Sequence, residues 1–371
     1  MSIPIPKSLS QKIKALSFFN ALLVVLLHAY TGNSPQSSES TALIIEKFIS
    51  IGLCGVGVPY FFMVSGFFLA HQYDNQISYS QLLKKRFSSL LKPYFYWCII
   101  YALTYVAFTV YGNHLAGRPL SDNTCLVMPL TSWQNPFRIF GFDMFLLPAN
   151  GPLWYVRNLM LLVLASPSLF AIMKRKLTGF LFLVIALFFY LAHFMVQRPL
   201  WQFFQIGFSF RGLLFFSLGI FLKRFPIQWT NQEYDHQYKR ACLSVILCIL
   251  WFALACPYTF LGPKLAFILL HLSFIVGCAA LWCLYDLFPK LEKMESMRVL
   301  GYSFFIFASH YAILNMLFCQ KACNLLKKHL TNNEFLIYAL RFFVTSVISI
   351  SLAFILDRYL PKLYKALTGN R

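Results

Sequence analysis

Two histidines lie within long apolar stretches of the chain, where ionisable side chains are uncommon. His28 follows the wholly apolar run that begins after Asn20, and His310 lies near the middle of the apolar stretch 299–319. An ionisable group at the centre of a bilayer costs about 2.5–3.5 kcal/mol, so such groups normally face the interior of a helix bundle or a wet cavity. An imidazole, with a pKa of about 6.5 in water, suits general-base chemistry on a hydroxyl acceptor. Both histidines are therefore candidate functional residues.

Each histidine also has a purely structural interpretation. A buried imidazole that bonds to a backbone carbonyl would explain His28 without catalysis. Ser303 precedes His310 by seven residues, so the two share a helical face and suggest a polar relay or a substrate contact. A packed polar network between helices explains this second pair equally well.

Arg157 follows Gly151-Pro152 and falls about one and a half turns into the helix expected to start there. A guanidinium in this position can bind a phosphate, a carboxylate or a glycan oxygen. The alternatives are that it extends outward to the membrane surface or pairs with Asp143.

A basic segment precedes the third apolar stretch. Lys85 and Arg86 lie in residues 81–94, where apolar side chains recur at helical spacing. These bases would suit an anionic, phosphate-bearing donor. A cluster of this kind is also the ordinary signal that fixes a loop on the cytoplasmic side.

The composition indicates the environment in which these residues lie. The chain of 371 residues is 59% hydrophobic and 12% charged, with a net charge of +20. Soluble domains carry about 25% charged residues, so we expect a polytopic membrane protein in the lipid bilayer. The basic excess then faces anionic headgroups, and no nucleic-acid partner is expected. We find no nucleotide-binding glycine loop and no Cys/His spacing typical of a metal site, so no metal is expected.

Hydropathy predicts an all-α bundle of about ten spans, forming one membrane domain over residues 1–371. Basic residues concentrate in alternate loops and at both ends of the chain, which predicts that both termini are cytoplasmic. The loops 32–49 and 113–151 are expected to be irregular caps. The expected spans are residues 15–31, 50–70, 93–112, 152–173, 178–196, 207–222, 241–260, 265–287, 299–319 and 336–360.

Five short motifs, in the same order and covering nearly the whole chain, give the sequence a resemblance to the membrane-bound acyltransferase 3 family. Each motif is weak alone, and the set in register is fairly specific. They are the first apolar stretch ending at His28, Gly57-Val-Pro-Tyr-Phe-Phe-Met-Val-Ser65-Gly66-Phe67, Lys85-Arg86-Phe87 with Pro93-Tyr94, Leu153-Trp154-Tyr155-Val156-Arg157, and Tyr302-Ser303-Phe304 through His310.

The resemblance implies an O-acyltransferase of the bacterial inner membrane. The family's usual donor is acetyl-CoA from the cytoplasm, a co-substrate and not a bound cofactor, and its usual acceptor is a hydroxyl of a cell-surface or lipid-linked glycan. His28 matches the family's essential histidine of the first span. Arg86 and Lys85 are then candidates for the donor's phosphates. Trp154, Arg157, Ser65, Ser303 and His310 are candidates for substrate binding or a polar relay.

One departure from the family pattern concerns the donor site. The family usually has an arginine eleven residues before the essential histidine, and this chain has Ser17 there. Lys14 lies three residues earlier on nearly the same helical face, so it is a candidate to supply the missing charge. If it does not, the chain handles its donor differently or is an inactive relative.

Two other classes of function fit the same polar residues. In a glycan or small-anion transporter or flippase they would line a path through the membrane. In a structural partner of a glycan-assembly complex they would serve packing alone. A gain of acyl mass on a glycan separates the enzyme from both alternatives.

Overall fold

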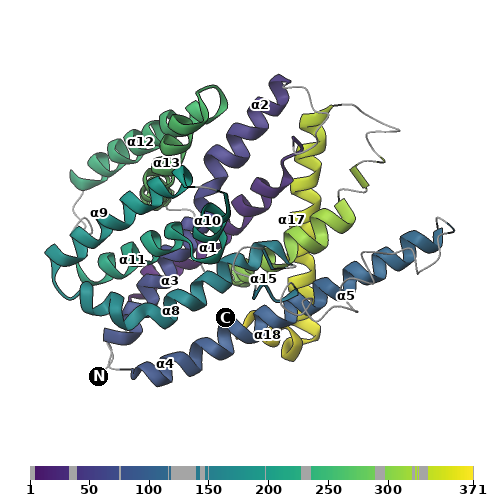
Figure 1. Cartoon of the computed structure of the whole chain (residues 1–371), viewed down its shortest axis with the longest axis horizontal. Coiled ribbons are helices and arrows are strands. Elements are labelled where there is room, and N and C mark those ends of the chain that lie inside the picture. Colours follow the sequence, from purple (N-terminus) through teal and green to yellow (C-terminus); the bar gives the residue numbers. More distant parts are fainter. Residues whose placement is uncertain are drawn as a thin grey trace.

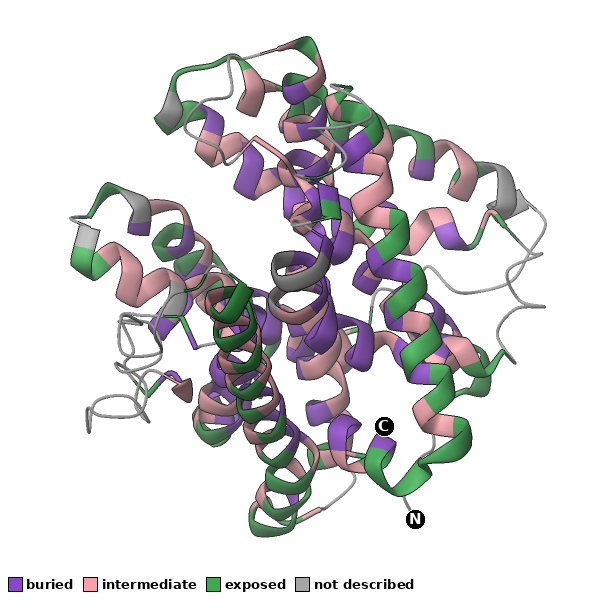
Figure 2. Ribbon diagram, turned by 90° about the vertical axis from the view of Figure 1, so that its right-hand side faces the viewer, coloured by how far each residue is buried: buried purple, intermediate pink, exposed green. Residues whose placement is uncertain are grey.

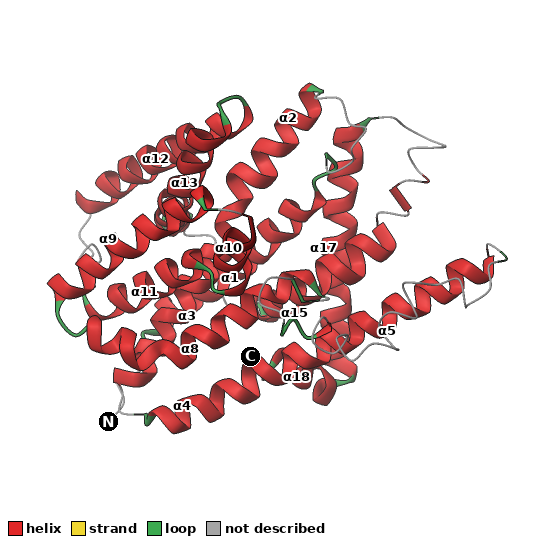
Figure 3. Ribbon diagram, in the orientation of Figure 1, coloured by secondary structure: helices red, strands yellow, loops and turns green. Residues whose placement is uncertain are grey.

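The computed structural model describes residues 5–32, 40–74, 77–115, 117, 139–142, 147–148, 150–196, 198–226, 235–288, 297–319, 322–323, 325 and 333–370. In these residues every regular element is a helix, loops connect the helices, and no strand is present (Figure 3). The predicted all-α polytopic bundle is confirmed. Most of the expected loop 113–151 lies outside the described residues.

The helices have the lengths that a membrane demands. At about 1.5 Å per residue, roughly 20 residues cross the hydrocarbon core. The main helices are α1 (Lys7–Ala29), α2 (Thr41–Lys47), α3 (Gly57–Asp74), α4 (Tyr79–Arg86), α5 (Lys92–Leu115), α8 (Trp154–Ile172), α9 (Lys176–Ala192), α10 (Arg198–Gln202), α11 (Phe210–Arg224), α12 (Asp235–Ala255), α13 (Pro263–Tyr285), α15 (Ser303–Ser309), α17 (Glu334–Tyr359) and α18 (Pro361–Thr368).

Eight helical stretches of the described chain are long and apolar enough to cross a membrane. Two further apolar helices, Lys176–Ala192 and Arg298–Ser309, are shorter and coincide with the expected spans 178–196 and 299–319. Within the second, the helix changes at His310 to a π-helix, His310–Cys319. The ten expected segments therefore all fall on helices, although only eight have full spanning length.

Two expected boundaries were wrong. The expected irregular loop 32–49 becomes helical at Thr41, and the helix then runs without interruption to Asp74. Its backbone passes through π and 3-10 turns between Phe48 and Val56, where Gly52 and Gly55 weaken the regular helix. Likewise, the basic segment continues directly into the next span, so Tyr79–Leu115 forms one long rod along an edge of the molecule (Figure 1).

Glycines bring the central helices into direct backbone contact. A Cβ placed on Gly66 of α3 would lie 2.0 Å from the Phe216 carbonyl oxygen, and one on Gly219 of α11 would lie 1.9 Å from that of Met63. Small residues at such interfaces are typical of membrane helices, because close backbone approach replaces the missing hydrophobic driving force. The pair α3–α11 therefore forms a tight seam.

The core surrounds α1, which packs against α3, α13, α15 and α17. Buried residues concentrate along these inner helices, whereas the outer faces are exposed (Figure 2). The long α5 and the pair α12–α13 lie at opposite edges (Figure 1). Their apolar side chains, such as Leu103 and Ile249, are 65% and 64% exposed, as expected for surfaces that contact lipid.

Candidate active site

The two ends of α1 define the two ends of the bundle. Its first turns lie near Asp286, at the end of α13, and near Gly301. Its last turn lies near Asn315 and Arg341. We call these the Lys12 end and the His28 end. The polar candidates divide between them.

At the His28 end, three rings from two elements meet. The His28 ring centroid lies 4.2 Å from that of Tyr311 and 5.2 Å from that of His310. His28 is half-buried, whereas His310 has no exposed surface. The structure thus brings together the two histidines that the sequence singled out from positions far apart in the chain.

The tautomer of His310 follows from its hydrogen bonds. Its Nδ1 lies 2.8 Å from the Phe307 carbonyl oxygen and 3.2 Å from that of Ile306. A carbonyl oxygen only accepts, so Nδ1 carries the proton and, in the neutral ring, Nε2 carries a lone pair. This Nε2 is buried and has no hydrogen-bond partner in the described chain. It is therefore available to accept a proton or a hydrogen bond.

The last turn of α1 is held by side chains from other helices. Asn315 donates to the His28 carbonyl oxygen at 2.5 Å, and Arg341 donates to that of Tyr30 at 3.3 Å. Arg341 also donates to the Asn315 side-chain oxygen at 2.7 Å. The final carbonyls of a helix lack partners within the helix, so these contacts satisfy them and fix where His28 lies.

Glu46 adds a further contact just beyond α1. Its buried carboxylate accepts from the Thr31 backbone N–H at 3.1 Å and from the Thr31 hydroxyl at 2.7 Å. Because Glu46 belongs to α2, this contact ties the end of α1 to the start of the second long helix.

The segment that leads into α8 borders the histidine pair. The buried Asn150 donates to the Ala308 carbonyl oxygen at 3.0 Å. A Cβ on Gly151 would lie 3.6 Å from the Tyr311 ring. Residues 113–151 are expected to form a cap. The described residue Asn150, however, has its side chain inside the bundle. Irregular backbone at such a position requires partners inside the protein, and Asn150 supplies one.

Arg157 is buried and donates to the Gly141 carbonyl oxygen. It supports the same incoming segment, to which Tyr94 also donates at the Phe140 carbonyl. The alternative partner Asp143 lies outside the described residues. In this arrangement Arg157 positions backbone around the site, and any contact with substrate stays a prediction.

The remaining candidates from the sequence do not all join this cluster. Ser65 lies 3.1 Å from the Tyr155 hydroxyl and links α3 to α8. Trp154 lies at the start of α8, beneath Arg211, whose guanidinium carbon is 5.0 Å from its ring centroid. Ser303 is the first residue of α15 and lies about 10 Å from His310 along the helix axis. The proposed Ser303–His310 relay therefore has no direct contact.

The Lys12 end carries the candidates for donor binding. Lys12 pairs with Asp286 at 2.6 Å, whereas Lys14 forms no ion pair with the described residues and lies with its Nζ 3.9 Å from the Cβ position of Gly301. Lys85 is exposed on α4. Arg86 donates to the Gln72 side chain at 3.4 Å. These bases share one end of the bundle, and Lys14 lies about 21 Å from His28 along α1.

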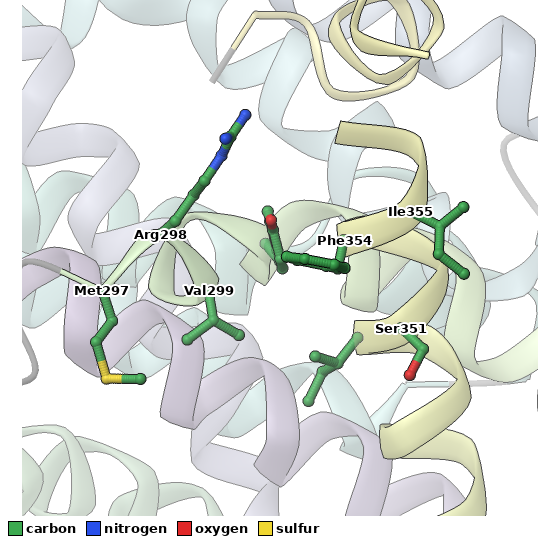
Figure 4. Close-up of a pocket in the computed structure, with 8 residues that line it drawn as sticks. Met297, Arg298, Val299, Ser351, Phe354 and Ile355 are labelled. Carbon is green, nitrogen blue, oxygen red and sulfur yellow. The ribbon is translucent and has the colours of Figure 1, made fainter. Parts of the chain in front are cut away.

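A cavity of about 550 Å³ also opens at the Lys12 end (Figure 4). Its lining is mostly apolar and comes from Met297–Val299 and from Ser351, Phe354 and Ile355 of α17. Arg298 points away from Met297 and Val299 in this view and pairs with Asp357. None of the candidate residues lines this cavity, so it is not the site of the histidine chemistry. The described residues contain no group of three potential metal ligands.

Four residues of the His28 end were missed from the sequence: Tyr311, Asn315, Arg341 and Glu46. Arg341 had a detectable signal, because it is a charged residue within the apolar stretch 336–360. Asn315 and Tyr311 follow His310 in the same apolar stretch and had a weaker one. Glu46 was assigned to a loop, so its burial was not anticipated.

Comparison with known proteins identifies the family. A family model described as an acyltransferase domain matches residues 13–358. The chain is similar to the succinoglycan biosynthesis protein ExoH of Rhizobium meliloti (strain 1021), with 25% identity over 276 residues, 73% of this chain and 68% of that protein. No solved structure matches the chain. With a family match over almost its whole length and a bundle of apolar helices, this chain belongs to the acyltransferase 3 family and is a multi-pass membrane acyltransferase.

Proposed function

We propose that the chain transfers an acyl group, acetyl in the first instance, from cytoplasmic acyl-CoA to a hydroxyl of a glycan. The glycan would be a cell-surface or lipid-linked saccharide, and the membrane the inner membrane of a bacterium. The observation that carries this proposal is the meeting of His28 and His310 at one end of the bundle, with Lys14, Lys85 and Arg86 at the other. The relative from succinoglycan biosynthesis supports a saccharide acceptor.

The separation of the two ends suits a donor with a long arm. The phosphates of acyl-CoA would bind the bases at the Lys12 end, which are able to contact anions. The thin pantetheine arm would then extend toward His28 over the distance set by α1. This orientation agrees with the loop charges, which predict that the Lys12 end is cytoplasmic.

The chemistry at the His28 end needs one base. His28 accepts the proton of the acceptor hydroxyl while the oxygen attacks the thioester carbonyl carbon. The C–S bond then breaks, and the proton passes to the leaving thiolate of coenzyme A. His310 presents a lone pair at Nε2 beside this pair, so it is placed to accept a hydrogen bond from the acceptor hydroxyl or from the His28 ring. Both histidines orient reactants in addition to moving a proton.

Mass spectrometry of surface glycans tests this proposal. A deletion strain would be complemented with wild type, with His28→Ala or with the control His114→Ala, which removes an exposed histidine of α5. We expect acyl groups on the glycan with wild type and His114→Ala, and none with His28→Ala at equal protein level in the membrane. Wild-type acylation by His28→Ala would refute the catalytic role of His28. Unaltered glycans in the deletion strain would refute the proposed function itself.

A further inference from the structure

A second cluster of polar and aromatic side chains lies on the opposite flank of the start of α8. It consists of Arg211 from α11, Tyr190 from the end of α9, His193 directly after α9, His271 from α13, and Trp154. Nothing in the proposed transfer step uses its basic residues. The cluster therefore calls for an explanation of its own.

Arg211 is the central observation. No described Asp or Glu forms an ion pair with it, and its guanidinium carbon lies 5.0 Å from the ring centroid of Trp154. A cation–π contact compensates a guanidinium for only part of the hydration that it loses inside a protein. An arginine inside a membrane bundle normally pairs with an acid or with backbone carbonyls. The half-buried Arg211 has neither kind of partner in the described chain, so its donors are available to an anion.

The groups around Arg211 suit hydroxyls. The Tyr190 hydroxyl is fully buried and has no hydrogen-bond partner in the described chain. The His271 Nδ1 lies 2.7 Å from the Phe267 carbonyl oxygen, so its proton is on Nδ1 and Nε2 carries the lone pair in the neutral ring. The Tyr190 and His271 rings are 4.9 Å apart. Together they provide acceptors and a donor beside the guanidinium.

Flat aromatic faces complete the cluster. The Trp201 ring stacks on His193 with centroids 6.5 Å apart and an interplanar angle of 14°. Trp154 presents a second indole, half-buried at the start of α8. Aromatic faces with a polar edge suit ligands that combine apolar C–H surfaces with hydroxyls, as sugar rings do.

The cluster lies close to the histidine pair through the start of α8. Tyr155 follows Trp154 in the chain. Its ring centroid lies 5.4 Å from that of Phe307, and the Phe307 centroid lies 6.1 Å from that of His310. The ring of Tyr311 touches the other side of the same segment at Gly151. Packed rings at the start of α8 therefore connect the two clusters.

We propose that Arg211, Tyr190, His271 and Trp154 form a subsite for a negatively charged sugar residue that neighbours the sugar being acylated. The carboxylate of a uronic acid or of a similar acidic sugar would bind Arg211, and its hydroxyls would bind Tyr190 and His271. The subsite would select acidic glycans and hold them in register with His28. The statement that the glycan is held in register with His28 rests on the proposed function. The binding of the acidic saccharide does not depend on it.

The test uses full-length protein in lipid nanodiscs and two matched probes. Trigalacturonic acid carries the charge, and its methyl ester has the same length and hydroxyls without it. We expect wild type to bind the acid about tenfold or more tightly than the ester, because a charge-assisted bond is stronger than a neutral one. Arg211→Gln should remove this preference and leave binding of the ester unchanged. The control Lys264→Gln, an exposed cation at the start of α13, should keep it.

Several outcomes would overturn the proposal. Equal binding of acid and ester by wild type, or absence of any binding, would do so. A preference that survives Arg211→Gln would place the charge contact elsewhere. Competition by inorganic phosphate as strong as that by trigalacturonic acid would mark a site for a lone anion. Arg211→Lys separates charge from geometry, because lysine keeps the charge without the planar group over Trp154.

Acyl transfer measured on the same preparations separates this proposal from the proposed function. If wild type releases no coenzyme A with any acceptor but still prefers the acid through Arg211, the saccharide subsite stands and the transferase assignment fails. If His28→Ala abolishes transfer while Arg211→Gln alters neither binding nor the choice between acid and ester, the subsite fails and the transferase assignment stands.

Discussion

The two histidine clusters use the same local device in different surroundings. His310 and His271 each bond through Nδ1 to a carbonyl oxygen three or four residues earlier in their own helix. This bond settles the tautomer without help from another helix. The neighbours differ, however. Near His28 the cation Arg341 donates to Asn315 and to Tyr30, whereas near His271 the cation Arg211 lies over the Trp154 ring and has no ion pair with the described residues.

We interpret this difference as follows: the arginine near His28 fixes the backbone of α1, whereas Arg211 is available to bind a ligand. At the His28 end, Arg341 and Asn315 donate to the last carbonyls of α1, and the two imidazoles remain available for the proposed chemistry. In the Arg211 cluster, the cation itself remains for the ligand. Fixed tautomers are thus common to both clusters, and the partners of the nearest arginine are the reason why we propose catalysis for one cluster and binding for the other.

The comparison of His28→Ala with His271→Ala should show the largest effect. We expect His28→Ala to lower kcat by about 10²–10⁴, since a general base contributes that much. His271→Ala should act chiefly on KM for the acceptor. Initial rates over a range of acceptor concentrations check both. A larger loss of kcat in His271→Ala than in His28→Ala would reverse the comparison.

Loosening the support of His28 should give a smaller loss. Asn315→Ala removes the bond to the His28 carbonyl and leaves Arg341 without its 2.7 Å partner, so we expect a loss of kcat of about tenfold with KM for acyl-CoA unchanged. Asn315→Asp keeps an acceptor for Arg341 and should lose less. Kinetics at equal protein level check this order, and equal rates for the two variants would show that Asn315 has no positioning role.

The donor bases should affect affinity more than rate. Lys14 is not paired within the described chain, so Lys14→Gln should raise KM for acyl-CoA several-fold with little change in kcat. Lys7→Gln, at an exposed position on the same helix, is the matched control. Titration with desulfo-CoA in nanodiscs gives the same comparison without turnover. Equal affinity in both variants would remove Lys14 from the donor site and leave the position of Ser17 uncompensated.

The smallest effect should come from Trp154, a residue of the Arg211 cluster that lies next to Tyr155 in the chain. Trp154 packs on Arg211 and precedes Tyr155, which links toward His310. Trp154→Phe keeps an aromatic face, and we expect a two- to threefold rise in KM for an acidic acceptor through the weaker cation–π contact. Rates with the acid and its methyl ester should show that only the acid is affected. An equal change with both probes would make Trp154 a packing residue alone.

Sequence reasoning reached the fold and part of the site for identifiable reasons. Apolar stretches of spanning length dictate helices, so the bundle and the ten segments were predictable. His28 and His310 were conspicuous because polar side chains are costly in lipid. Their contact was not predictable, since it depends on how α1 and α15 pack. Arg341 and Arg211 carried the same signal of cost but were overlooked among the loop cations, and Asn150 was hidden in a segment expected to cap the surface.

The seam between α3 and α11 limits the routes through the protein. At Gly66 and Gly219 the two backbones touch with no side chain between them. A chain as wide as an amide cannot slip between helices in such contact. Any corridor that joins the Lys12 end to the His28 end must therefore run elsewhere than along this seam. Larger side chains at these glycines would push the two helices apart.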